Sequence, residues 1–400
     1  MLKLSRRAGR IQPQPMFRVL AEAQHIENLG QPVIHLEIGD TSSLMDPELQ
    51  RLIREDRSLT ASFGYSPSAG EPALRDILAR KYAEEYGFPF HRENVVVTPA
   101  NAAISQLLAL LCDEGDSVLL PDPAFSTYQL AIRFNDLTPV FFPLREEAGF
   151  APDLAEIRAR MDADPKVRVL IIDNPSNPLG IAHSSEIMEG LAALCDERGV
   201  ALIIDQTYKN LVYGERPRRP NHRPTTFYVY SLSKDAAAPA LRVGCVVGDA
   251  TIVGKVADYN SLFYSCLPKP LQLTAARYLV DGYARQAGRI NAIIEGRIEA
   301  VTAILRPSPW LSFVRPNAAI YIYLNISRTG LDSETFTKRF LHERAVCVCP
   351  GTGFGPSGRF YVRICLSGRE DELYAGCAAL VEFCAAVGAE ISAREGVKTP

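Results

Sequence analysis

Lys234 stands directly after an apolar run that is typical of a buried strand, and its neighbours carry hydroxyl and guanidinium groups. Ser231 and Ser233 precede the lysine, and Arg242 follows eight residues later. A lysine amine is the side chain that forms a Schiff base with an aldehyde. A serine hydroxyl and the planar fork of an arginine are good ligands for a phosphate. The segment therefore predicts a lysine nucleophile beside an anion site, and the alternative is a surface lysine with unrelated neighbours.

A carboxylate ends a second apolar run. Asp205 follows Ala201–Ile204, and Tyr208 lies three residues further on. A buried carboxylate needs a positive partner, and a protonated pyridine nitrogen is one such partner. That ion pair would keep the ring cationic, so that it can accept electrons from a substrate carbanion. The alternative is an aspartate that caps the next helix.

Two more strand ends carry short motifs. The run Val167–Asp173 is followed by Asn-Pro-Ser-Asn-Pro-Leu-Gly at positions 174–180, where two X-Pro steps and a glycine favour a rigid turn. Such a turn would fix the side chain of Asn177, which can donate to a phenolate oxygen; a plain turn is the alternative. At Thr98–Ala102 a strand changes into a helix, and the free N–H groups at that helix start can bind a phosphate.

The elements around these motifs predict an α/β fold. Helical patterns at 102–112, 125–134 and 185–197 separate six apolar strand-like runs, at 95–98, 117–121, 167–173, 201–205, 226–231 and 243–248. This alternation predicts a mostly parallel central sheet with helices on both faces, with ligands beyond the carboxyl ends of its strands. The last part of the chain reads as a smaller α+β domain. We therefore expect an N-terminal segment at 1–45 that packs with the small domain, a large domain at 46–285 and a small domain at 286–400.

Composition narrows the class of protein. A formal net charge of -3 argues against a nucleic-acid partner, and no apolar run reaches the length of a membrane span. The nine cysteines are dispersed without a C-x-x-C pair, which favours reduced thiols in a cytoplasmic protein and no metal site. Cys347 and Cys349 lie in an apolar stretch, so two core strand residues are favoured over a redox or metal role.

Taken together, these motifs resemble those of the class I and II aminotransferases, the aspartate aminotransferase-like enzymes of pyridoxal 5′-phosphate (PLP) fold type I. The N-P-x-N-P-x-G, D-x-x-Y and S-x-S-K-x(7)-R-x-G elements occur in the family's order, and the resemblance covers essentially the whole chain. Further matching segments are Ile38–Asp40, Tyr65–Gly70 with Leu74-Arg75, Pro123–Tyr128, Pro350-Gly351 with Phe354-Gly355, and Val362–Ile364.

The resemblance implies a role for each matching residue. Lys234 would carry the cofactor as a Schiff base and then act as the base, with Asp205 on the pyridine nitrogen. Asn177 and Tyr208 would bind the phenolate oxygen, and Phe125 would stack on the ring. The phosphate would be held by Ser231, Arg242, Asn101, the amide of Ala100, and Tyr65 of the neighbouring subunit, which implies a homodimer with shared active sites. Arg363 would bind the substrate α-carboxylate, helped by Asn177 and the backbone near Gly39; the alternative for Arg363 is a salt-bridged strand residue.

The leading interpretation is an aminotransferase that moves an amino group from a small L-amino acid to a 2-oxo acid. Five positions differ from the residues that are common in this family, which suggests a divergent branch: Leu179, Ala100, Ala319, Ala240 and Thr41. Other reactions of the same cofactor therefore stay open. These are elimination or replacement, cyclisation of a hydroxylated amino acid such as hydroxyarginine, and O2-dependent oxidation. A non-catalytic effector-binding module is disfavoured, because the family-like pattern leaves no room for a DNA-binding domain. His35, near Gly39, faces either the substrate or, as we favour, the seam between domains.

Overall fold

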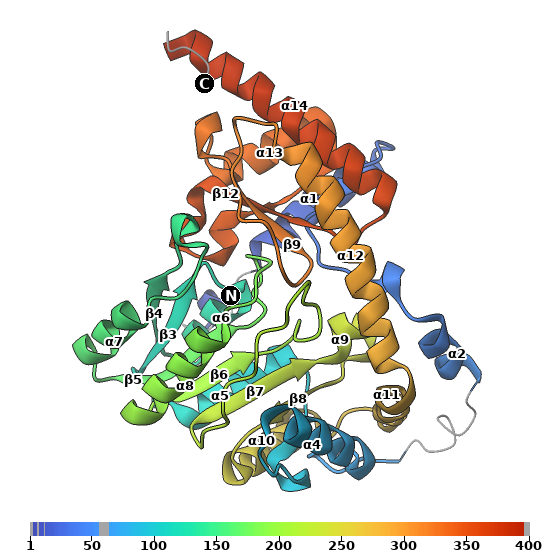
Figure 1. Ribbon diagram of the computed structural model, residues 1–400, viewed down its shortest axis with the longest axis vertical. Helices are drawn as coiled ribbons and strands as arrows, with labels where there is room; N and C mark the ends of the chain where they lie inside the picture. The colour runs from blue at the N-terminus through green and yellow to red at the C-terminus, as the bar shows by residue number, and fades with distance from the viewer. Residues whose placement is uncertain (1–2, 6–7, 12, 56–63, 396–400) are drawn as a thin grey trace.

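The computed structural model describes residues 3–5, 8–11, 13–55 and 64–395 of the chain. Its centre is a seven-stranded sheet in the order β2-β8-β7-β6-β5-β3-β4 (Figure 1). Every neighbouring pair from β7 to β4 is parallel, whereas β8 runs antiparallel to both of its neighbours. The predicted mostly parallel sheet is confirmed. The strands are β2 (Val95–Val97), β3 (Ser117–Asp122), β4 (Thr138–Pro143), β5 (Val167–Asp173), β6 (Ala201–Asp205), β7 (Thr226–Ser231) and β8 (Gly244–Val247).

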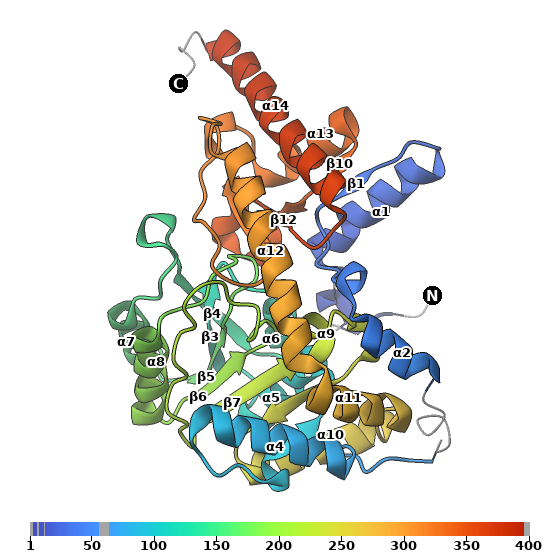
Figure 2. The ribbon, with the colours of Figure 1, turned by 45° about the vertical axis from the view of Figure 1, so that its right-hand side comes forward.

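Alternating side chains of the central strands enter two separate cores. Leu170 and Ile172 of β5 pack in one core, while Val169 and Ile171 pack in the other, because successive strand residues point to opposite faces. One face is covered by α4 (Pro72–Tyr86), α7 (Leu154–Ala163), α8 (Ser185–Arg198) and α11 (Lys269–Asp281), and the other by α5 (Ala100–Leu111), α6 (Ser126–Phe134) and α10 (Ala250–Tyr264) (Figures 1 and 2). Burial on both faces explains why these strands are apolar throughout.

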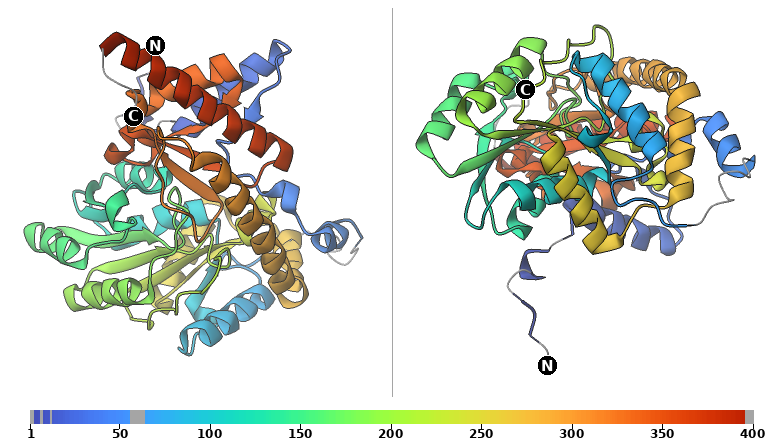
Figure 3. Two further views of the ribbon diagram at one scale, coloured as in Figure 1. Left: turned by 45° about the horizontal axis from the view of Figure 1, so that its top comes forward. Right: turned by 90° about the horizontal axis from the view of Figure 1, so that it is seen from below.

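A second layer of strands lies above the carboxyl edge of the main sheet. β9 (Tyr321–Asn325), β12 (Tyr361–Cys365) and β11 (Cys349–Pro350) form an antiparallel sheet, and β1 (Ile34–His35) pairs in parallel with β10 (Val346–Cys347). The helices here are α1 (Pro15–Asn28), α12 (Tyr283–Leu305), α13 (Ser333–Arg344) and α14 (Glu370–Glu395), and the short α2 (Pro47–Glu55) precedes the main sheet (Figure 3). β9, β12, α12, α13 and α14 share their own core, whereas Leu49 of α2 and Cys349 of β11 pack into a core of the main sheet. The domain boundaries at residues 45 and 285 stay a prediction.

The N-terminal helix joins this second layer. Val19, Ala23 and Ile26 of α1 are buried against Leu341 of α13 and Cys347 of β10. Figure 2 shows α1 beside β1 and β10. The amphipathic pattern of α1 therefore reflects packing against the C-terminal part of the chain.

Two features differ from the sequence-based expectation. The edge strand β4 was not expected, because Pro139 and Pro143 argue against a strand; an edge position tolerates proline, since one side of the strand needs no donors. In addition, residues 370–390 of α14 are apolar enough for a membrane span by length and composition alone, so the expectation of no such segment was wrong. Leu373, Leu380 and Phe383 of this helix are nevertheless fully buried in the second core, as in a core helix of a globular protein.

The loop after β5 connects the two layers. Gly180 adopts φ 69°, and its carbonyl accepts hydrogen bonds from the amides of Asn317 at 3.1 Å and Ala318 at 2.9 Å. A Cβ at this position would collide with the main-chain carbonyl oxygen of Tyr321 on β9. The glycine is therefore needed both for its left-handed backbone and for the close approach of β9.

We predict that Gly180→Ala lowers the free energy of unfolding by about 2 kcal/mol more than Gly199→Ala does. Gly199 also has a positive φ, 61°, but a Cβ there would meet nothing within 4 Å. Gly199→Ala should cost only about 1–2 kcal/mol of backbone strain, whereas Gly180→Ala adds a clash of the kind that costs about 1–3 kcal/mol. Urea unfolding of both variants measures the difference. Equal losses would show that β9 does not constrain the loop.

Candidate active site

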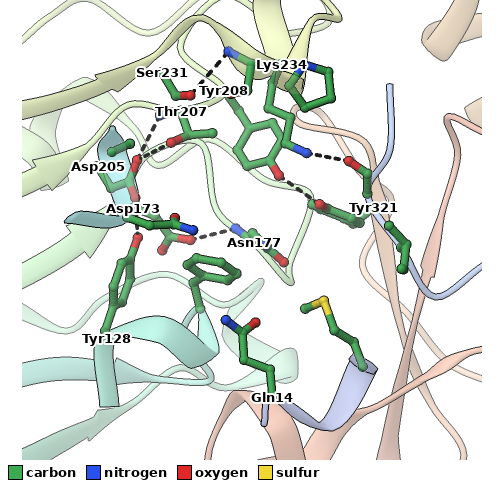
Figure 4. A pocket seen from close by; sticks show the side chains of 18 of the residues that line it. Gln14, Tyr128, Asp173, Asn177, Asp205, Thr207, Tyr208, Ser231, Lys234 and Tyr321 are labelled. Carbon is green, nitrogen blue, oxygen red and sulfur yellow. Dashed lines mark hydrogen bonds between the residues drawn. The ribbon is translucent and has the colours of Figure 1, made fainter. Parts of the chain in front are cut away.

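A cavity of about 240 Å3 opens where the carboxyl ends of β5, β6 and β7 face the second layer. All the residues that the sequence singled out for the site line it, apart from Tyr65. Figure 4 shows the side chains of Asn177, Asp205, Tyr208, Ser231 and Lys234 around this cavity, together with Tyr128 of α6, Gln14 and Tyr321. The side chain of Tyr65 is 88% exposed and lies outside this cavity. The lining residues predicted from sequence are Gly39, Ala100, Asn101, Phe125, Asn177, Asp205, Tyr208, Ser231, Lys234, Arg242 and Arg363.

The amine of Lys234 projects into this cavity from α9 (Leu232–Asp235), the short helix that follows β7. Its Nζ donates to the main-chain carbonyl of Gly39. Burial lowers the pKa of Lys234, and the guanidinium groups of Arg363 and Arg242 act in the same direction. A depressed pKa increases the share of neutral amine, which is the form that attacks an aldehyde or accepts a proton.

Asp205 holds a buried carboxylate at the end of β6. Its Oδ2 accepts from the hydroxyl of Tyr128 at 2.9 Å, and its Oδ1 accepts from the amide and the hydroxyl of Thr207 at 2.9 and 2.6 Å. Burial raises the pKa of Asp205, while these hydrogen bonds lower it. A turn follows, so the alternative of a helix cap was wrong. Within the described chain no basic side chain forms an ion pair with Asp205, and the carboxylate is available to a cationic ligand.

Arg363 presents the opposite charge on the other side of the cavity. The guanidinium is 1% exposed; Nη1 donates to Oδ1 of Asn177 at 2.8 Å, and Nη2 donates to the carbonyl of Glu37. Its Cζ lies 4.2 Å from the ring centroid of Tyr321, whose hydroxyl is 2.7 Å from that of Tyr208. Nε has no hydrogen-bond partner. No ion pair of Arg363 with a carboxylate occurs among residues 13–55 and 64–395, so the salt-bridge alternative is not supported.

A third part of the cavity, after those around Asp205 and Arg363, surrounds the start of α5. Pro99 precedes this helix and gives it no side-chain cap, so the amides of Ala100 and Asn101 lack a side-chain acceptor. Arg242 is exposed and has φ 55°, and its Nη1 contacts only the carbonyl of Pro239, at 3.0 Å. Ser231 lies at the end of β7. Helix amides, a hydroxyl and a guanidinium together suit a phosphate dianion.

Several cavity residues were given no role by the sequence analysis, although Tyr128 lies in a segment that matches the family. Tyr128 and Thr207 are the hydrogen-bond partners of Asp205, and Tyr321 packs on Arg363. Gln14, Met16 and Phe17 come from the start of α1, far from the rest in sequence. The position of Thr207, two residues beyond Asp205, was a local signal that could have been used. For the others, only the tertiary fold brings them to the cavity.

His35 does not line this cavity, in agreement with the favoured alternative of a role at the seam. Its Nδ1 lies 2.8 Å from Oε1 of Glu37, and its Nε2 lies 3.3 Å from Oε1 of Glu27. The hydrogen bond to Glu37 raises the pKa of His35 to about 9. His35 therefore belongs to a separate charged cluster.

These features fit PLP and define the class of protein. The cavity offers a carboxylate without a cation, a guanidinium without an anion, a phosphate cradle and a lysine amine of lowered pKa. A pyridinium nitrogen, a substrate carboxylate, a phosphate and an aldehyde supply the four matching groups. A fold of this type with this site is that of a PLP-dependent enzyme.

Comparison with known proteins identifies the family. The model of the family "Aminotransferase class I and II" matches residues 31–380, and the chain belongs to this family. It is 29% identical to an aspartate aminotransferase of Pyrococcus horikoshii, over 86% of this chain and 88% of the relative. It is 27% identical to an arginine–pyruvate transaminase of Pseudomonas aeruginosa, over 92% and 93% of the two chains. The solved structure of Thermus thermophilus aspartate aminotransferase with maleate has the same fold, with a TM-score of 0.89 at 24% identity over 96% of this chain and 100% of that one.

The chain is therefore a PLP-dependent aminotransferase that acts on amino acids. Among the outcomes that the sequence left open, transamination is favoured over elimination, cyclisation and oxidation, because these relatives are named as transaminases.

Asp173 adds a second buried carboxyl group to the floor of the cavity. It is paired in register with Asp205 on the neighbouring strand. Its Oδ2 accepts from the amide of Asn177 at 2.7 Å, and its Oδ1 has no hydrogen-bond partner. Burial raises the pKa of Asp173 to about 8, and the charge of Asp205 acts in the same direction. Asp173 is thus held as a neutral acid at neutral pH.

We predict that Asp173→Asn stabilises the cofactor-free protein increasingly as the pH rises from 5 to 7. Below pH 4 the carboxyl group is protonated in both folded and unfolded chains. Between pH 4 and pH 8 the folded wild type retains a proton that the unfolded chain has lost, so its stability falls by up to about 1.4 kcal/mol per pH unit. The variant lacks this proton, so its advantage should grow by about 1–3 kcal/mol. Urea unfolding at several pH values tests this, and a pH-independent difference would contradict it.

Proposed function

We propose that Lys234 carries PLP as a Schiff base and that the enzyme uses it to move the amino group of a small L-amino acid to a 2-oxo acid. The observation that carries this proposal is that the Lys234 amine lines the same cavity as two buried charges without a charged partner in the described chain, Asp205 and Arg363. The bound cofactor supplies the electron sink for a carbanion at the substrate Cα. The protein residues bind, orient and transfer the proton.

The proposed cofactor contacts divide the cavity into three parts. The carboxylate of Asp205, fixed by Tyr128 and Thr207, pairs with the ring nitrogen. Its buried hydrogen bonds hold it in place, so little reorganisation is needed when charge develops. The phenolate oxygen is bound by Asn177 and Tyr208, and Phe125 covers one ring face. The phosphate is held by the amide of Ala100, Asn101, Ser231 and Arg242.

Proton transfer is assigned to Nζ of Lys234. With cofactor and substrate bound, this amine would take the proton from the substrate Cα and carry it to the cofactor side. Burial and the two nearby guanidinium groups, which lower its pKa, keep enough of it neutral for this task. The carbonyl of Gly39 orients the amine when it is free.

Substrate binding is assigned to Arg363. The donation from Nη1 to Asn177 fixes the plane of the guanidinium, and the ring of Tyr321 covers its face. A fixed fork of this kind binds a carboxylate by two parallel hydrogen bonds. The backbone at Gly39 completes the carboxylate site, and the side chain there must be absent because Tyr321 occupies the space of a Cβ.

We also propose a homodimer with shared active sites, in which Tyr65 reaches the phosphate of the partner. The exposed side chains of Tyr65, Leu262 and Phe263 support this, because such large apolar groups commonly mark an interface. Sedimentation of the cofactor-loaded protein as a dimer is the expected result, and a monomer would contradict it. We further propose a cytoplasmic location, supported by nine free cysteines, and cell fractionation tests it.

We predict that Lys234→Ala abolishes turnover and removes the adduct that borohydride fixes on the protein. Without the amine, neither the Schiff base nor the proton transfer can form. Peptide mass analysis after reduction should place the adduct on residue 234 of the wild type. The exposed Lys255→Ala serves as the control and should retain both the adduct and turnover. An adduct on another lysine would overturn the assignment.

We predict that Arg363→Lys lowers kcat/KM about 30- to 1000-fold, because the bidentate contact with the carboxylate contributes about 2–4 kcal/mol. The cofactor should still bind, since Arg363 contacts the substrate in this scheme. Stopped-flow absorbance of the half-reaction with an amino-acid panel, combined with mass identification of products, measures the effect and names the donor. Accumulation of pyridoxamine phosphate with donor alone indicates transamination. Release of ammonia, peroxide or a cyclised product would contradict it.

A further inference from the structure

Three side chains with metal-binding groups converge between β1 and β10, outside the active-site cavity. His35 and Cys347 are register partners in this parallel pair, so their side chains lie on the same face. Glu37 is two residues beyond His35, in the bend that follows β1, and its carboxylate lies against the imidazole of His35. One nitrogen of His35, one carboxylate oxygen of Glu37 and Sγ of Cys347 all lie within 4.8 Å of one another. Within the described part of the chain, this is the only such group.

The inner part of this cluster is fully buried and incompletely satisfied. Glu37 and Cys347 are each 0% exposed. Oε1 of Glu37 lies 2.8 Å from Nδ1 of His35, and Oε2 has no hydrogen-bond partner of good geometry; the neighbouring thiol of Cys347 interacts with the same carboxylate, which raises the pKa of Cys347. A buried carboxylate oxygen without a donor is unfavourable, so it indicates a site that a further ligand completes.

The residues around this cluster are of the kind that orient the ligands of a metal ion and attract cations. The far nitrogen of His35, Nε2, lies 3.3 Å from Oε1 of Glu27 on α1. A carboxylate in this position fixes the ring orientation and leaves the other nitrogen for a metal. A cavity of about 350 Å3 reaches His35 and Glu37 from the surface. Its wall also carries Asp40 and Glu372, which attract cations and give an entry path.

We propose that His35, Glu37 and Cys347 bind one divalent transition-metal ion, with Zn2+ the best match, and that the remaining coordination position opens to water in this second cavity. Imidazole, thiolate and carboxylate ligands suit zinc and its neighbours, whereas Mg2+ and Ca2+ require oxygen ligands. A thiolate and a carboxylate neutralise the dication inside the protein. The ion enters as the thiol proton and the imidazolium proton leave, so metal and protons compete.

The proposed metal site and the active-site cavity share one backbone segment. The carbonyl of Glu37 accepts from Arg363, and the carbonyl of Gly39 accepts from Lys234. The side chain of Glu37 points to the cluster, and its main chain serves the cavity. Metal binding would thus stiffen the segment from 35 to 39 without contacting the substrate. The proposal does not depend on the identity of the amino acid that the enzyme transaminates.

The experiment titrates Co2+ into the chelator-treated holoenzyme at pH 8. Tetrahedral Co2+ with a thiolate ligand absorbs in the visible region beyond the cofactor bands, and Zn2+ should displace it. We expect one ion per chain. Cys347→Ser should lose the Co2+ absorption and weaken binding at least about tenfold, and Glu27→Gln should weaken it about 10- to 100-fold while leaving the direct ligands intact. Absence of stoichiometric binding to the wild type would overturn the proposal.

Matched variants distinguish loss of the metal ligands from a general effect of changing a buried residue. Cys384→Ser changes another buried cysteine, on α14, and should bind Co2+ as the wild type does. His35→Gln tests a ligand at a less buried position, in case Cys347→Ser does not fold. Each variant must retain bound cofactor, which shows that it is folded. Unchanged affinity in His35→Gln and Cys347→Ser, or an equal loss in Cys384→Ser, would place the ion elsewhere and refute the site.

Discussion

The active site depends on keeping two opposite charges buried and apart. The carboxylate of Asp205 and the guanidinium of Arg363 each lie inside the protein, yet neither is paired with the other or with another charged side chain in the described chain. Burial of an unpaired charge is unfavourable, and neutral hydrogen bonds offset only part of that free energy. Tyr128 and Thr207 supply those bonds to Asp205, and Asn177 supplies one to Arg363. A ligand with one positively charged and one negatively charged group would complement both side chains.

The fold meets this constraint with two layers. The parallel strands β5, β6 and β7 end at one edge of the sheet, so Asp173, Asp205 and Ser231 are neighbours there although the chain separates them widely. The second layer brings Gly39, Tyr321 and Arg363 down onto that edge. Gly180 links the layers, since its carbonyl binds the segment before β9 and its missing side chain admits that strand. Charge separation across the cavity therefore follows from the way the layers are joined.

Hydrogen bonds also connect the Lys234 side and the Arg363 side of the cavity to one backbone segment. Nζ of Lys234 donates to the carbonyl of Gly39, and Nη2 of Arg363 donates to the carbonyl of Glu37, so both basic side chains contact the same segment of backbone. That segment continues into the His35 cluster. The cluster and the cavity share the backbone segment from 35 to 39: the side chains of His35 and Glu37 belong to the cluster, whereas the carbonyls of Glu37 and Gly39 accept hydrogen bonds from the cavity. An ion bound in the cluster would therefore affect the rigidity of this segment without contacting Arg363 or Lys234. Asp173 lies beside Asp205, and its raised pKa keeps it neutral. The cavity therefore avoids a second negative charge at this position.

The sequence alone determined the central architecture and placed Lys234 at the end of a buried strand. Apolar runs, Gly and Pro positions and the residues at strand ends are local signals, so β2, β3, β5, β6, β7 and β8 were predicted, and all the lining residues expected from family motifs except Tyr65 lie in one cavity. Their individual roles stay a prediction. The edge strand β4 was missed, because its prolines are acceptable only at an edge, and edge position depends on the whole sheet.

Only the tertiary structure decided which other groups meet at the two sites. Tyr128, Tyr321 and Gln14 reach the cavity from distant parts of the chain, and no local pattern records such contacts. The same holds for His35, Glu37 and Cys347. The spacing of Cys347 and Cys349 indicated two core residues, and both are indeed buried, but the partners of Cys347 lie more than three hundred positions earlier and join it through the pairing of β1 with β10. Side-chain chemistry can be read along the chain, whereas the distance between side chains is set by the packing of the folded protein.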